Sequence, residues 1–161
     1  MNQTHLHLLI THLPIFGSIL GGLVLAHGIW TKSNQTKIAA YNVLIISSIG
    51  AVVAYLTGEG AEETVEKIPG VMESIIDKHA DFAVYALVSL SILGVAALIG
   101  LFIALSKSSL SRTIAMTTLV IAFVSFGLIA WTGYLGGQIR HTELNASNPT
   151  QIENGENEKD D

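Results

Sequence analysis

Histidine is the residue type in this sequence with the clearest capacity for chemistry. Five of the six histidines stand near the chain's first apolar run or just outside later ones: His5, His7, His12, His79 and His141. The sixth, His27, has no other histidine near it. Neutral imidazole is the commonest metal ligand in proteins and a frequent axial ligand of haem iron. The first question is therefore whether the fold brings these imidazoles together.

Four long apolar runs must position the histidines. They cover residues 8–30, 38–56, 82–105 and 114–139, each near the ~20 residues that an α-helix needs to cross a bilayer core. Half of the residues are hydrophobic, and the 13% that are charged amount to about half the usual fraction of a soluble domain. The runs lack the alternation of barrel strands. The sequence predicts an all-α integral membrane protein whose four-helix bundle occupies residues 1–144.

The charged residues predict the orientation of this bundle. The connection between the first two runs and the connection between the last two carry lysine or arginine but no acid. All 13 acidic residues lie in 59–81 or after Arg140. Because basic connections stay in the cytoplasm, we expect both termini and the 59–81 connection on the periplasmic side of a bacterial inner membrane.

Two polar segments complete the organisation. In 59–81, apolar residues recur at three- and four-residue spacing between acids, which predicts a short amphipathic outer loop. We expect there either short helices along the membrane surface, broken at Pro69 and Gly70, or a solvated loop that packs its apolar face on the bundle. Residues 145–161 are rich in Asn, Glu and Asp without periodicity, which predicts a disordered acidic tail.

On this topology the histidines near the outer helix ends fall at one membrane level. Haem b in a helical bundle takes one or two axial histidines from facing helices. We predict a haem b site with His12 and His79 as the axial pair. His141, alone or together with His7, is expected as a second site or alternative ligand. Arg140 stands beside His141, where it can pair with a haem propionate.

A non-haem metal site is the principal alternative. Glu59 and Glu62 are expected at the histidines' level, and mixed imidazole and carboxylate ligands suit copper, zinc or iron. Such a site would use His12, His79 and His141 with one of these glutamates. A cofactor-free structural subunit of a membrane complex is a third possibility. Cysteine is absent, which excludes iron–sulfur, thiolate and covalent c-type haem sites.

The haem hypothesis predicts an electron-transfer subunit of a respiratory complex. Its partners would be other membrane subunits, a quinone, and a c-type cytochrome or other periplasmic protein that docks on the acidic outer face. No basic patch indicates nucleic acid, and no catalytic triad or phosphate-binding loop indicates a hydrolase or a nucleotide-driven enzyme. Glycines such as Gly17 and Gly21 suit either a flat macrocycle or simple helix packing.

Three motifs resemble those of a family of uncharacterised bacterial four-helix membrane proteins. They read HLLITHLPI from His7, TGEGAEE from Thr57 with a later Pro-Gly and His79, and TGYLGGQIRH from Thr132. The resemblance spans residues 6–143 and departs at Thr142, where the family often has proline. It implies a shared site rather than a named reaction. The motif positions implied for that site are His12, Glu59, Glu62, His79, Arg140 and His141.

Overall fold

The computed structural model describes residues 3–68 and 71–140, with the backbone alone at Arg140. The described residues form five helical segments: α1 (Gln3–Ile10), α2 (His12–Trp30), α3 (Asn34–Val65), α4 (Glu73–Leu105) and α5 (Ser111–Arg140). Because α1 and α2 together make one span, four spans are long and apolar enough to cross a membrane. The predicted all-α four-helix architecture is confirmed. The predicted tail at 145–161 and His141 lie outside the described residues.

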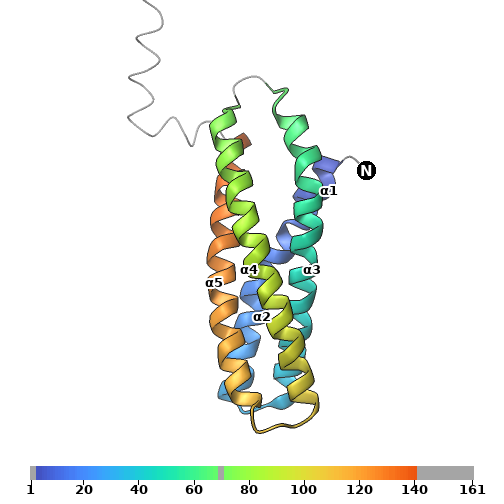
Figure 1. Cartoon of the computed structure of the whole chain (residues 1–161), viewed down its shortest axis with the longest axis vertical. Coiled ribbons are helices and arrows are strands. Elements are labelled where there is room, and N and C mark those ends of the chain that lie inside the picture. Colours follow the sequence, from blue (N-terminus) through green and yellow to red (C-terminus); the bar gives the residue numbers. More distant parts are fainter. Residues whose placement is uncertain (1–2, 69–70, 141–161) are drawn as a thin grey trace, which may run out of the picture.

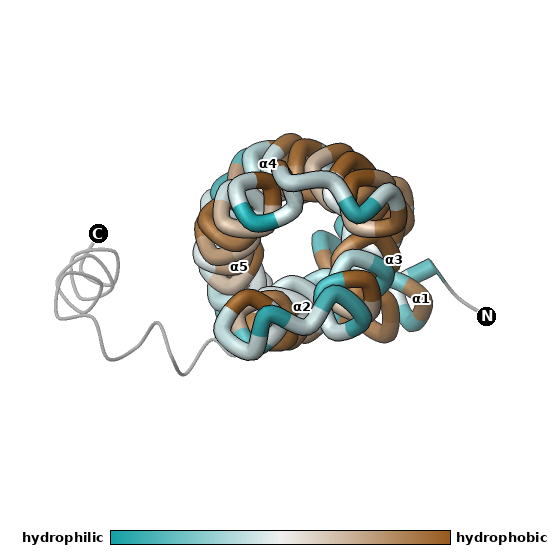
Figure 2. Tube along the Cα trace, turned by 90° about the horizontal axis from the view of Figure 1, so that it is seen from below, coloured by the Kyte–Doolittle hydropathy of each residue, from teal (hydrophilic) through white to brown (hydrophobic). Residues whose placement is uncertain are grey.

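The four spans stand side by side around a ring (Figure 2). Going around it, α2 packs against α3, α3 against α4, α4 against α5, and α5 against α2, while α1 lies against α3. Figure 1 shows the two basic connections at one end of the bundle, and the first described residues with the end of α5 at the other. We call these the basic end and the outer end.

The first span is broken near the outer end. Thr11 forms a turn between α1 and α2, and its amide still donates to the His7 carbonyl at 3.0 Å. Pro14 follows closely and has no N–H to donate to the carbonyl one turn earlier, at Ile10. The break lets α1 lean against the outer part of α3 (Figure 1).

Small residues bring the helices into close contact. A Cβ added at Gly17 would lie 2.7 Å from Ser47 Cβ, and one at Gly21 would lie 2.6 Å from the Leu44 side chain. Hydrophobic burial drives little association between helices in lipid, so such interfaces depend on close packing of small residues. Gly17 and Gly21 therefore serve helix packing, the second of the two roles considered for them.

The outward faces of the helices are strongly apolar. Large exposed side chains recur along every span, among them Phe16, Leu20, Ile46, Ile92, Leu98, Phe102, Val120 and Phe123. A soluble protein rarely exposes contiguous apolar surface on this scale. Together with the four spans, these faces fit a multi-pass protein surrounded by lipid.

The acidic outer segment does not form the expected short surface helices, so that expectation was wrong. The expected break at Pro69 and Gly70 lies outside the described residues. At about 1.5 Å per residue, the 32-residue α3 is about 48 Å long, against about 30 Å for the bilayer core. Residues 59–65 continue α3, and residues 73–81 begin α4. Ile75 and Ile76 are buried against the bundle. The apolar periodicity thus reflects extensions of the two long helices beyond the apolar core.

One buried polar group has no partner among the described residues. The Tyr41 side chain is fully buried against Gly100 of α4, and its hydroxyl makes no hydrogen bond. Removing an unsatisfied buried hydroxyl without changing the shape of the side chain lowers the desolvation cost of folding. We expect Tyr41→Phe to stabilise the purified protein by about 1 kcal/mol. A thermal unfolding curve in detergent that shows a lower midpoint for the variant would contradict this.

Candidate metal-binding histidine pair

Two histidines from distant parts of the chain meet at the outer end of the bundle. His7 lies on α1 and His79 on α4, and their ring centroids are 6.5 Å apart with the ring planes at 82°. Both side chains are partly buried. The structure thus brings two imidazoles together at this end, and it pairs His7 rather than His12 with His79.

Each ring is held by a backbone carbonyl of a neighbouring helix. His7 Nδ1 donates to the Ala54 carbonyl of α3 at 2.9 Å, and His79 Nδ1 donates to the Thr132 carbonyl of α5 at 2.9 Å. A carbonyl oxygen only accepts, so Nδ1 carries the hydrogen in both rings. In a neutral imidazole this leaves the Nε2 lone pair free to bind a metal.

Glycine gives both rings access to these carbonyls. In a helix each Cβ tilts toward the N-terminus, so a side chain at i+4 covers the carbonyl of residue i. Gly58 stands four residues after Ala54, and Gly136 stands four residues after Thr132. A Cβ added at Gly136 would lie 3.0 Å from His79 Cε1, and one at Gly58 would lie 3.7 Å from His7 Cε1. The same arrangement, a glycine four residues after the accepting carbonyl, therefore orients both imidazoles.

The separation of the rings restricts the coordination they can provide. An imidazole nitrogen binds a divalent metal at about 2.0–2.1 Å, so rings on opposite sides of one metal have centroids roughly 6.4 Å apart, and rings at a tetrahedral angle roughly 5.2 Å. The observed 6.5 Å matches the first arrangement. The spacing therefore fits two imidazoles on a single metal, and it also lies in the usual range for direct contact between two rings.

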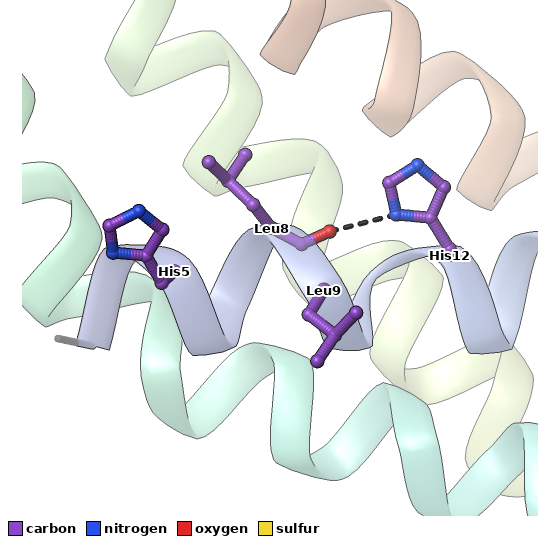
Figure 3. Close-up of a pocket in the computed structure, with 4 residues that line it drawn as sticks. All are labelled: His5, Leu8, Leu9 and His12. Carbon is purple, nitrogen blue, oxygen red and sulfur yellow. Dashed lines mark hydrogen bonds between the residues drawn. The ribbon is translucent and has the colours of Figure 1, made fainter. Parts of the chain in front are cut away.

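His12 points away from this pair. Its side chain is exposed, Nδ1 bonds the Leu8 carbonyl within the same span at 2.8 Å, and its ring stacks on Phe16. Figure 3 shows His5 and His12 on one side of the first span, lining an open hollow of about 640 Å³ with Leu8 and Leu9. The five residues from His7 to His12 turn the helix by about 140°, which separates the two side chains.

The predicted carboxylate ligands lie with other acids. Glu62 is on the part of α3 beyond the apolar run 38–56. Partial burial raises the pKa of Glu62 above its usual value, and the charges of Glu66, Asp77 and Glu59 raise it further. Within residues 3–68 and 71–140, no three His, Asp or Glu side chains are grouped to hold a metal. The Arg140 side chain and His141 lie outside the described part.

The sequence contains one feature that points to the carbonyl contacts of His7 and His79. The third motif places Gly136 four residues after Thr132, and Gly58 of the second motif stands four residues after Ala54, which precedes that motif. A glycine at this spacing indicates a helix carbonyl that no side chain covers. The spacing does not show which histidine will donate a hydrogen bond to that carbonyl. Only the relative rotation of the packed helices decides this.

No protein-family model matches the chain, and no curated protein or solved structure was found to be similar to it. Fold and site together define a helical, multi-pass membrane protein with an oriented pair of imidazoles at one end of its bundle.

Proposed function

We propose that the protein is a membrane-embedded b-type cytochrome in which His7 and His79 are the axial ligands of one haem. The observation that carries the proposal is the pair itself, with both Nδ1–H groups bound to carbonyls and a ring separation of 6.5 Å. This revises the axial pair expected from the sequence by replacing His12 with His7. The resemblance to bacterial four-helix membrane proteins agrees with a shared site at this end.

The donor set fits haem better than a non-haem ion. Haem supplies four equatorial nitrogens to its iron, so two opposed imidazoles complete the coordination. Structural zinc sites take four ligands, and catalytic zinc sites take three from the protein. The pair would need at least one more ligand to make such a site, and His141, a ligand expected from the sequence, would be a candidate.

The protein's own residues hold and tune the site. The carbonyls of Ala54 and Thr132 fix the tautomer and rotation of the rings, and such bonds increase the basicity of a ligating imidazole. Gly58 and Gly136 keep the helices close to the rings. Arg140 is proposed to pair with a propionate at the surface. Bound haem would supply reversible one-electron transfer at its iron.

The surroundings suggest how electrons enter and leave. The spans lie in lipid, where a quinone or a partner subunit can approach their exposed apolar faces. Acidic side chains on the outer extensions of α3 and α4 would steer a basic soluble partner, such as a c-type cytochrome, toward the histidine pair. The basic connections at the other end support a periplasmic location for this end by the positive-inside rule. The proposal takes the membrane to be a bacterial inner membrane and the protein to be part of a respiratory complex.

The absorption spectrum of the purified, detergent-solubilised protein tests the proposal. We expect a Soret band and, after reduction with dithionite, a sharp α-band of a low-spin bis-imidazole haem. A colourless preparation that contains stoichiometric copper, zinc or iron by elemental analysis would replace haem by a non-haem site. A colourless, metal-free protein that co-purifies with other subunits would favour a structural role instead.

A further inference from the structure

A lysine is buried at the basic end, where the described part of the chain has no acid. Lys37 of α3 is only 9% exposed, and its ammonium group donates to the Ser111 hydroxyl at the start of α5 at 2.6 Å. That hydroxyl is neutral. Within the described residues no carboxylate pairs with Lys37, because the acids lie in 59–81 at the opposite end or beyond residue 140.

The helix termini around Lys37 do not supply a counter-charge. Two helices, α3 and α5, begin at this end and two, α2 and α4, end here, so their partial charges offset one another. A buried charge without a counter-ion is costly. An anion beside Lys37 and Ser111 would relieve that cost.

Two further lysines at this end occupy a backbone conformation that favours glycine. Lys32 follows α2 with φ 55°, and Lys107 follows α4 with φ 52°. In both turns the next residue donates back to the helix, Ser33 to Gly28 at 3.0 Å and Ser108 to Ile103 at 3.3 Å. Helix ends of this type usually place glycine at the left-handed position. The chain thus keeps two cations here at a cost in backbone strain.

The surface beside these cations is apolar. Trp30 at the end of α2 is 81% exposed, and Leu105 at the end of α4 is 61% exposed. Tryptophan is enriched at membrane–water interfaces, and lysine stems can lie along apolar surface while the ammonium reaches the headgroups. A ligand here would meet cations and hydrogen-bond donors at one end and apolar surface next to them.

We propose that the basic end binds the phosphate of an anionic phospholipid headgroup, with Lys37 and Ser111 as its direct contacts. Arg112, the neighbour of Ser111, and the strained Lys32 and Lys107 supply the surrounding positive charge. Basic pockets between transmembrane helices bind anionic headgroups through this chemistry. The adjoining apolar surface selects a lipid rather than free phosphate. This site lies at the opposite end from the histidine pair and does not depend on it.

The test measures lipid binding to the full chain in detergent. Native mass spectrometry counts bound lipid while phosphatidylglycerol, phosphatidylcholine or inorganic phosphate is added. We expect phosphatidylglycerol to bind the wild type and Lys37→Gln to weaken that binding by roughly tenfold or more, the loss typical of a hydrogen bond to a charged group. Lys67→Gln, the same charge change in the outer connection, should bind as the wild type does.

Two further variants test the same contacts in case Lys37→Gln does not fold. Lys37→Arg retains the charge and should retain binding, and Ser111→Ala should weaken it. Equal binding of phosphatidylglycerol and phosphatidylcholine to the wild type would overturn the proposal. So would equal losses in Lys37→Gln and Lys67→Gln. Binding of inorganic phosphate with no preference for the anionic lipid would overturn the assignment to a lipid.

Discussion

His79→Ala is expected to abolish the low-spin haem spectrum of the purified protein, and His7→Ala is expected to do the same. Each change removes one of the two proposed ligands, whose rings lie 6.5 Å apart. His12→Ala should leave the spectrum unchanged, because that ring is exposed and bonded within its own span. Haem content per polypeptide and the reduced α-band are the measurements. We expect haem affinity to fall by at least about tenfold in the first two variants.

Two controls separate ligation from folding in this series. Adding free imidazole to His79→Ala should restore part of the low-spin spectrum, which would not follow if the histidine only supported the fold. Circular dichroism should show unchanged helix content in all three variants. Loss of the spectrum in His12→Ala with retention in His7→Ala would instead support the pairing expected from the sequence.

Gly136→Ala is expected to disrupt the site although every histidine is retained. Its new Cβ would lie 3.0 Å from His79 Cε1 and 3.2 Å from His79 Nδ1, so the ring must move away from the Thr132 carbonyl. Loss of a bond that orients a metal ligand typically lowers affinity by about 10–100-fold. Haem content and the reduced spectrum of the variant report the loss.

Gly137→Ala is the matched control for this change. It is the next residue on α5, and an added Cβ there meets nothing within 4 Å. The change in helix propensity is the same for both glycines, and at Gly137 it should stabilise the helix by about 0.5–1 kcal/mol. The haem content of Gly58→Ala, whose added Cβ lies 3.7 Å from the His7 ring, should be higher than that of Gly136→Ala and lower than that of Gly137→Ala. Equal spectra for Gly136→Ala and Gly137→Ala would refute the orienting role of Gly136.

Local sequence determined the elements and the two polar ends of this protein. Each span is a run of apolar residues long enough to cross the bilayer core. In lipid a helix satisfies the hydrogen bonds of its own backbone, so each span can be predicted without knowing which helices pack against it. The separation of basic connections from acidic segments was equally local. For the same reason the sequence sufficed to bring His7 and His79 to one end of the bundle.

Tertiary structure alone decided which side chains meet. The choice of His7 over His12 depends on the rotation of α1 about its axis and on the break at Thr11, and neither follows from apolar periodicity. The burial of Lys37 likewise depends on tertiary packing, because its side chain lies against Gly28 of α2 and reaches across to Ser111 of α5. The physical reason is that residues facing lipid and residues facing other helices are both apolar, so hydropathy does not show which face of a helix points inward. The rotation of each helix is set by the close packing of glycine and serine between helices.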